Sequence, residues 1–258
     1  MIPSINTPFG SIPTFPLWAV LGILAMFLLT SISLRRQDNF VAEENYIFPK
    51  LVLSGMIGLV SSGLLDALFK LPISGEFKIT GITFYGGFIG AVTSLYIVLK
   101  ATQAKTNYAV TEWLNLLTRP FILFHIFGRI GCFFGGCCYG KETDCILGVI
   151  FRDNLANNII HNGAKRYPTQ LFEATALVII FLLLSKKKNK FINYVFLYAV
   201  ARFIIEFFRG DERGYISGIL SPAQCISICL LAVIIGYTII TAWKKHHKKD
   251  NTAHPKAT

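Results

Sequence analysis

Long runs of apolar residues alternate with short polar loops along this chain. A helix that crosses the hydrocarbon of a bilayer needs about 20 residues, and seven runs approach or reach that length. We therefore predict an all-α polytopic membrane protein with seven transmembrane helices. The expected helices are Thr14–Ser33, Phe48–Phe69, Thr83–Leu99, Trp113–Ile130, Gln170–Ser185, Ile192–Phe208 and Ile219–Trp243.

Local sequence features refine this outline. Arg119 and Pro120 interrupt the fourth run, which we expect to be shortened, tilted or kinked because proline removes a helical hydrogen bond. No basic residue precedes the first run and no small-residue cleavage site follows it, so we expect a retained helix and no cleaved signal peptide. Residues 1–243 then form a single transmembrane domain. After Trp243 we expect a short basic tail over 244–258 without regular structure.

Composition agrees with the apolar runs. The chain of 258 residues is 53% hydrophobic and only 15% charged, whereas about a quarter of an ordinary soluble domain is charged. The net charge of +11 suggests a nucleic-acid partner, but its distribution argues against one. Cationic residues gather in alternate loops and the tail, which is the positive-inside pattern of membrane proteins. They are Arg35, Arg36, Lys50, Lys100, Lys105, Lys186–Lys188, Lys190, Lys244, Lys245, Lys248 and Lys249.

This charge bias predicts an orientation. The N-terminus is expected outside and the C-terminus in the cytoplasm. The loops at 70–82 and 210–218 and the long segment at 131–169 then fall on the outer side, and with them any chemistry that they carry.

Charged side chains at membrane depth are costly and are functional candidates by default. Arg129 lies in the fourth predicted helix and Glu173 in the first turn of the fifth. Arg202, Glu206 and Arg209 are spaced i, i+4 and i+7, which places them on one helix face. A buried ion-pair network that locks helices together is one interpretation. An outward-facing cationic cavity is the other, because three arginines against two acids leave a positive surplus that suits a phospholipid phosphate.

Two further features accompany these charges. Pro168 suits the start of the fifth helix, and Thr169 or Gln170 can cap it. Gly86 and Gly87 open the third helix, in the stretch "TFYGGFIGA". Such glycines either allow close helix packing or let backbone N–H groups face a ligand.

Four stretches of the chain resemble the prolipoprotein diacylglyceryl transferase family, over about residues 14 to 243. They are "GITFYGGFIGA" (81–91), "RP…GRIGCFFGGCCYG" (119–140), "YPTQLFEA" (167–174) and "YAVARFIIEFFRGDERG" (198–214). The resemblance implies seven helices and an outward N-terminus. It also implies transfer of the diacylglyceryl group of phosphatidylglycerol to a prolipoprotein cysteine, with loss of glycerol phosphate. It implies no metal or organic cofactor.

The resemblance also assigns residues. Arg129 and Arg202 are the expected phosphate clamps, Glu206 orients one of them, and Arg209 follows them in the family motif. Gly86 and Gly87 match the glycine pair of the third helix. The candidate catalytic residues are thus Arg129, Arg202, Glu206, Tyr85 and Cys137, and the candidate substrate-binding residues are Gly86, Gly87, Arg209, Glu173, Cys132 and Tyr139.

This chain departs from the family pattern at several positions. Tyr85 stands where the family usually has a histidine assigned as general base, and a phenol with a pKa near ~10 suits that role poorly. Cys132, Gly135 and Cys137 replace Asn, Asn and Glu of the signature segment. The scaffold and lipid site therefore carry over more firmly than the base and the acceptor.

The six cysteines allow several interpretations. Cys132, Cys137, Cys138 and Cys145 lie near the expected outer face, where disulfides form. A metal site is the second interpretation: their spacing does not match common zinc ligands, although His125 and His161 could contribute to such a site. Buried inert thiols are the third interpretation, chiefly for Cys225 and Cys229. The fourth is that Cys137, activated by a low pKa beside Arg129, serves as a nucleophile.

Several functions remain open from the sequence. The first is the phosphatidylglycerol-dependent transfer to a prolipoprotein. The second is a divergent transferase on the same scaffold, with phosphatidylglycerol or a related anionic phospholipid as donor and a glycan, lipid or other protein as acceptor. A covalent intermediate on Cys137 is one route for this transfer. The third is a non-catalytic lipid-binding membrane protein. A transporter is disfavoured because no matching pair of broken helices is visible.

Overall fold

The computed structural model describes residues 4–7, 10–35, 40–79, 81, 83–151, 153, 162–210 and 220–253. Its described part contains α-helices near all seven predicted positions, so the all-helical class is confirmed. The helices are α1 (Thr14–Leu34), α2 (Phe40–Ser74), α3 (Phe84–Ala101), α4 (Val110–Gly135), α5 (Thr169–Leu183), α6 (Lys190–Glu206) and α7 (Pro222–Ala253).

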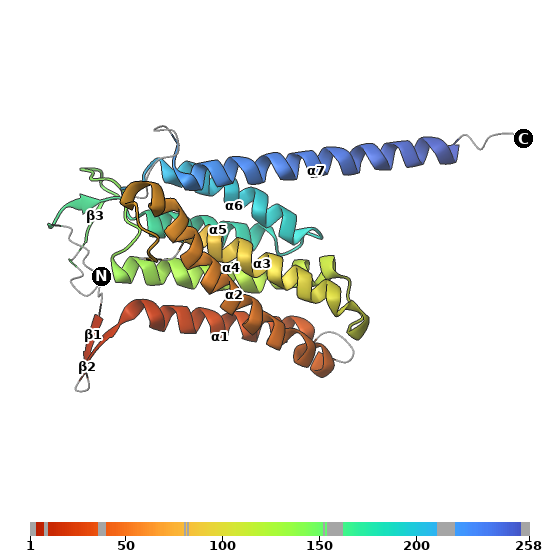
Figure 1. Ribbon diagram of the computed structural model, residues 1–258, viewed down its shortest axis with the longest axis horizontal. Helices are drawn as coiled ribbons and strands as arrows, with labels where there is room; N and C mark the ends of the chain where they lie inside the picture. Colours follow the sequence, from red (N-terminus) through yellow and green to blue (C-terminus); the bar gives the residue numbers. More distant parts are fainter. Residues whose placement is uncertain are drawn as a thin grey trace, which may run out of the picture.

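The helices run alongside one another as an elongated bundle (Figure 1). The most extensive helix pairs are α2 with α3 and α1 with α4, and α4, α5 and α6 contact one another. Among the described helices, α1, α2, α3, α4 and α7 are long and apolar enough to cross a membrane. The 15 residues of α5 are apolar but shorter. The protein is therefore a polytopic membrane protein.

Small β-structures gather at one end of this bundle, which we call the strand end (Figure 1). An N-terminal hairpin pairs β1 (Ser4–Thr7) with β2 (Gly10–Pro13), and β3 (Val149–Ile150) pairs with β4 (Lys165–Arg166), both antiparallel. The α4–α5 segment and the start of α7 also lie at the strand end, whereas the loops that join α3 to α4 and α5 to α6 lie at the other (Figure 1). Helix periodicity alone gave no sign of these hairpins.

Two packed clusters hold the helices together. Around the functional candidates, α3, α4, α5 and α6 bury Tyr85, Ile122, Leu177, Tyr194 and Tyr198 against one another. Toward the opposite end, a second cluster surrounds the fully buried Trp113. Most other large apolar side chains stay exposed on the helix surfaces, as expected where the surrounding solvent is lipid.

The structure overturns one part of the expectation for the fourth helix, that it is shortened, whereas a tilt or kink at Pro120 stays a prediction. Pro120 lies inside α4, which is assigned as one helix from Val110 to Gly135. The guanidinium of Arg119, the charged residue before this proline, stacks over the Phe181 ring at 4.2 Å. Gly136 ends the helix in the left-handed conformation, with φ 73°, where glycine carries no steric penalty.

The structure also corrects two helix ends. The backbone of α7 stays helical to Ala253, so our expectation of irregular structure from residue 244 is wrong for 244–253. Lysine is a good helix former and lets an established helix continue past the apolar run. In contrast, α6 ends at Glu206, before the predicted Phe208. Residues 254–258 lie outside the described chain.

Candidate functional site

Five ionised side chains are buried together where α4, α5 and α6 reach the strand end. Their exposed fractions are 7% for Arg129, 0% for Glu173, 3% for Arg202, 9% for Glu206 and 6% for Arg209. These are the residues that the sequence singled out. Burying charge is costly unless the charges are paired, so the contacts among these five side chains decide what the site is.

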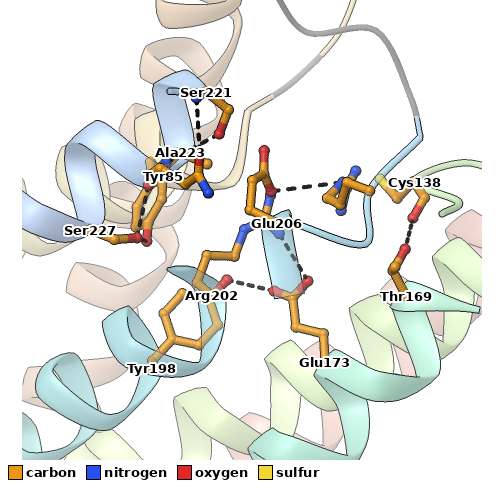
Figure 2. A network of polar contacts seen from close by, with 12 residues as sticks. Tyr85, Cys138, Thr169, Glu173, Tyr198, Arg202, Glu206, Ser221, Ala223 and Ser227 are labelled. Carbon is orange, nitrogen blue, oxygen red and sulfur yellow. Dashed lines mark hydrogen bonds and ion pairs between the residues drawn. The ribbon is translucent and has the colours of Figure 1, made fainter. Parts of the chain in front are cut away.

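Glu173 is the hub of this group, which we call the ionic cluster. Its Oε1 lies 2.9 Å from Arg129 Nη2 and accepts a 2.6 Å hydrogen bond from Tyr198 Oη. Its Oε2 lies 3.9 Å from Arg202 Nη1 (Figure 2). One carboxylate from α5 therefore joins an arginine of α4 to an arginine of α6.

Glu206 is the second acid and faces Arg202 across one helical turn. Its Oε2 lies 2.6 Å from Arg202 Nη2 and 4.0 Å from Arg209 Nε. The expected helix face carrying all three residues is not formed, because α6 ends at Glu206. Arg209 reaches Glu206 another way: it lies in a β-bridge with Gly140 that holds the chain beside the helix end.

The segment that follows α4 is joined by backbone hydrogen bonds to the start of α5 and to the end of α6. Gly140 N–H donates to Tyr167 C=O at 2.9 Å, Lys141 N–H to Phe208 C=O at 2.8 Å, and Gly210 N–H to Tyr139 C=O at 3.1 Å. A side chain at Gly140 would collide with this arrangement, because a Cβ there would lie 2.6 Å from Tyr167 C=O. Three motifs that are far apart in sequence thus form one unit.

Thr169 and Gln170 also bind the segment that follows α4 and do not cap α5. Thr169 Oγ1 donates to Cys138 C=O at 2.7 Å (Figure 2), and Gln170 Nε2 donates to Cys137 C=O at 2.6 Å. The helix itself begins after Pro168 with no side-chain capping bond. Our capping expectation is wrong because the signature segment competes for the same donors.

The glycines of α3 lie at its contact with α2. A Cβ at Gly86 would stand 2.8 Å from Ser61 C=O, and one at Gly90 would collide with the Ser61 side chain. Gly87 is less crowded, with Ser62 Cβ at 3.5 Å. Close packing, the plainer of the two interpretations, is therefore confirmed for Gly86 and Gly90.

Tyr85 points from the first turn of α3 toward α7 and is 5% exposed (Figure 2). Its hydroxyl lies 2.6 Å from Ser227 Oγ, and Ser227 Oγ donates its only proton to Ala223 C=O at 2.8 Å. Tyr85 must then donate to Ser227. A phenol that uses its proton in this way is a positioned donor, not a free base.

Sequence reasoning passed over several neighbours of the ionic cluster. His125 accepts a 3.3 Å hydrogen bond from Arg129 Nε, lies 3.2 Å from Tyr194 Oη through its Nδ1, and stacks on Phe84 with ring centroids 4.0 Å apart. Tyr198 binds Glu173. The signal was present, because His125 precedes Arg129 by one turn, and Tyr198 precedes Arg202 by one turn, on the same faces.

The cysteines settle some of the alternatives. None of the six described cysteines forms a disulfide, so the disulfide interpretation is wrong for this structure. Cys225 is half-buried and Cys229 is exposed on α7, contrary to the buried thiols that we expected there. Cys145 is exposed as well. His161 lies outside the described residues.

Three of the thiols come together. The Sγ atoms of Cys132, Cys137 and Cys138 all lie within 4.8 Å of one another, and we call them the thiol cluster. Hydrogen bonds with the other two thiols, and then burial, raise the pKa of Cys137 above its ordinary value. Our expectation of a low pKa beside Arg129 is therefore wrong, and the electrostatic reason for a nucleophilic Cys137 is lost.

Tyr139 lies just after the thiol cluster, where the Arg166 guanidinium packs over its ring at 4.9 Å. Arg166 also pairs with Glu142 at 2.7 Å. These contacts tie β4 to the signature segment at the rim of the site.

Comparison with known proteins identifies the scaffold. The sequence profile described as prolipoprotein diacylglyceryl transferase matches residues 4–240. The chain belongs to the prolipoprotein diacylglyceryl transferase family. The resemblance seen in the four motifs is thereby confirmed, and these motifs are the ones that carry the ionic cluster, the glycines of α3 and the segment that follows α4.

Among bacterial relatives, the chain is 37% identical over 230 residues to the phosphatidylglycerol–prolipoprotein diacylglyceryl transferase of Clostridium tetani, covering 84% of this chain and 87% of the relative. It is 33% identical over 225 residues to the enzyme numbered 2 of that name in Clostridium perfringens, covering 82% and 84%. The Finegoldia magna relative of the same name is 28% identical over 246 residues, covering 90% and 91%. The match of this member of the diacylglyceryl transferase family thus covers 84% to 91% of the length of these three relatives.

Proposed function

We propose that this protein transfers the diacylglyceryl group of phosphatidylglycerol to the cysteine thiol of a prolipoprotein. The thiol sulfur forms a C–S bond to the glyceryl carbon, and the C–O bond to glycerol phosphate breaks. The relatives carry this activity in their names. The ionic cluster supplies a site that suits the phosphate.

One observation carries the proposal. Arg202 Nη1 is buried and donates to no acceptor among the described residues, although Glu173 Oε2 lies 3.9 Å away. A buried, unused guanidinium donor is costly and is matched by a phosphate oxygen, which accepts hydrogen bonds from arginine well. The three arginines and two acids of the ionic cluster also leave one net positive charge for an anion.

The geometry suggests a division of labour. Arg129 and Arg202 hold the phosphate, and their charge stabilises the leaving glycerol phosphate as the C–O bond breaks. Glu173 and Glu206 keep both guanidinium groups in place, and Arg209 reinforces Glu206. Gly86 and Gly87 serve by bringing α3 close to α2, which places Tyr85 at the wall of the site.

We further propose that all seven helices span a bacterial plasma membrane and that the site faces the outer leaflet. The lysine-rich loops that follow α3 and α5 lie at the end of the bundle opposite the strand end (Figure 1). The positive-inside rule assigns that end to the cytoplasm. The N-terminal hairpin and the ionic cluster then belong to the outer side.

The test is a transfer assay with purified protein, phosphatidylglycerol and a peptide that carries a lipobox cysteine, read by mass spectrometry of the peptide. We expect a thioether-linked diacylglyceryl peptide and free glycerol phosphate. Arg202→Lys keeps a positive charge but loses the second donor, so the rate should fall roughly 10²- to 10³-fold. Arg119→Lys changes an arginine of α4 that stacks on Phe181, away from the ionic cluster, and should retain the wild-type rate.

Two outcomes would contradict the proposal. Consumption of phosphatidylglycerol without a thioether on the peptide would favour the divergent acceptor. Binding of phosphatidylglycerol without any product would favour a lipid-binding protein.

A further inference from the structure

The thiol cluster has no role in the phosphate site described above. Cys132 stands on the last turns of α4, and Cys137 and Cys138 follow Gly136 in the turn beyond it. All three are half-buried. Three soft ligands, none of them fully buried, thus converge on one point.

This convergence depends on a backbone conformation that only tertiary contacts support. Cys138 has φ 64°, a left-handed value that costs a residue with a side chain about 1–2 kcal/mol. Thr169 Oγ1 and Gln170 Nε2 hold the carbonyls of Cys138 and Cys137 at 2.7 and 2.6 Å. Strain of this kind persists where surrounding structure enforces it, often at functional sites.

The spacing of the sulfurs fits a metal ion. In a tetrahedral zinc site with Zn–S bonds of about 2.3 Å, the ligand sulfurs lie about 3.8 Å apart. The three Sγ atoms already lie within 4.8 Å of one another, so small side-chain rotations would complete three of the four ligand positions. Thiolates select soft or borderline metals such as zinc over magnesium or calcium.

A second observation points to a missing occupant. Gln170 is fully buried, and its Nε2 is bound to Cys137 C=O. Its Oε1 has no hydrogen-bond donor among the described residues. A buried acceptor beside the thiol cluster is therefore available to a group that enters the site, such as a water on a metal ion.

The ionic cluster also provides no group that is available to remove the proton of the acceptor thiol. Transfer to a thiol requires the thiolate, yet Glu173 and Glu206 are engaged by arginines. His125 is enclosed between Arg129 and Tyr194, and Tyr85 donates its proton to Ser227. Cys132 follows Arg129 by three residues on α4, about one helical turn, so the thiol cluster adjoins the proposed phosphate site.

We propose that Cys132, Cys137 and Cys138 bind a Zn²⁺ ion whose fourth position receives the acceptor thiol. This inference rests on the proposed function. Catalytic zinc sites have three protein ligands and one open position, and a coordinated thiol loses its proton. That proton passes to solvent. The zinc-bound sulfur then forms the C–S bond while the C–O electron pair leaves with glycerol phosphate. Zinc undergoes no redox change.

The first test measures metal in the full-length protein, purified in detergent, loaded with zinc and freed of excess. We expect one zinc ion per chain. Replacing Cys132, Cys137 or Cys138 by serine should reduce bound zinc to background, whereas Cys145→Ser, an exposed cysteine of the same segment, should retain it. Absence of zinc from the wild type, a copper ion in its place, or retention in all three serine variants overturns the proposal.

The second test asks whether the acceptor reaches the metal, and it needs no variant. The protein is loaded with Co²⁺, and a lipobox peptide is added. We expect the sulfur-to-cobalt charge-transfer absorption to increase with the cysteine peptide and to stay constant with a peptide that carries serine instead. A spectrum that does not respond to the cysteine peptide overturns the acceptor role.

The third test separates this inference from the proposed function. Removing zinc with a chelator should lower the transfer rate roughly 10²- to 10⁴-fold, the range attributed to acid–base assistance, and added zinc should restore it. Full transfer without zinc overturns the zinc proposal and leaves the proposed function intact. A cobalt spectrum that responds to the peptide, with no transfer under any condition, supports the metal site and overturns the proposed function.

Discussion

The ionic cluster and the thiol cluster adjoin each other at the end of α4 but are held in place differently. The ionic cluster collects side chains from three helices, and its members compensate one another's charge. The thiols come from one short stretch of chain and are positioned by backbone carbonyls that Thr169 and Gln170 bind. Loss of one member should therefore unbalance the first cluster and leave the fold around the second intact.

The largest effect is expected at the hub of the ionic cluster. Glu173→Gln preserves shape but leaves Arg129 and Arg202 without their shared anion. Breaking a buried ion pair costs about 3–5 kcal/mol, so thermal unfolding in detergent should occur at a much lower temperature. Glu142→Gln is the matched control, because its 2.7 Å pair with Arg166 is exposed and should contribute at most about 1 kcal/mol. Equal decreases in unfolding temperature for the two variants would show that the buried ion pairs of Glu173 contribute no more than the exposed pair of Glu142.

The hydrogen bond that orients this hub should have the next largest effect. Tyr198→Phe removes the 2.6 Å donor to Glu173, and hydrogen bonds to charged groups contribute about 1.5–3 kcal/mol. Tyr194→Phe removes a bond to the His125 imidazole and should cost only about 0.5–1.5 kcal/mol. Chemical unfolding of the two variants in parallel measures the difference. If Tyr194→Phe lowers the free energy of unfolding more than Tyr198→Phe does, Glu173 is not the hub of the ionic cluster.

A smaller effect is expected where α5 holds the thiol cluster. Thr169→Val removes the 2.7 Å bond to Cys138 C=O and should lower stability by about 0.5–1.5 kcal/mol. It should also speed alkylation of Cys138 by a thiol reagent, since the turn is freed. Thr118→Val removes a bond of the same length within α4 and should leave that alkylation rate unchanged. An unaltered rate in Thr169→Val would mean that the turn is held by other contacts.

The smallest effect has the opposite sign. Cys138→Gly relieves the left-handed strain of φ 64° at the cost of a more flexible unfolded chain, so stability should rise by about 0.5–1 kcal/mol. Cys138→Ala removes the same thiol but keeps the strain, so it should not be stabilised. Thermal unfolding of both variants gives the comparison. Destabilisation by the glycine variant would show that the thiol itself stabilises the fold.

The fold could be predicted because each membrane helix is determined by its own stretch of sequence. A run of apolar residues satisfies its backbone hydrogen bonds within itself, so helices near all seven positions were found from their own sequences. Helix ends were less certain because they depend on neighbours: α6 stops at Glu206, and Arg209 joins the site through Gly140. The N-terminal hairpin escaped prediction because its strands are only 4 residues long.

In the candidate site too, some features were predictable from the local sequence and others depended on how the helices pack. Arg129, Glu173, Arg202 and Glu206 were evident because charge at membrane depth demands a reason. Which acid pairs with which arginine was not evident. Spacing can place Glu206 near Arg202 on one helix, but only helix packing brings Glu173 of α5 between arginines of α4 and α6.

The sequence by itself determined the helices, the family and the identity of the buried charges, since each of these is a property of local hydrophobicity or of residue order. The tertiary structure alone decided that three cysteines meet within 4.8 Å. Their spacing in sequence resembles no common metal motif. They converge because Gly136 and Cys138 turn the chain through left-handed conformations and two side chains of α5 hold that turn, and such contacts between distant segments leave no periodic trace in a sequence.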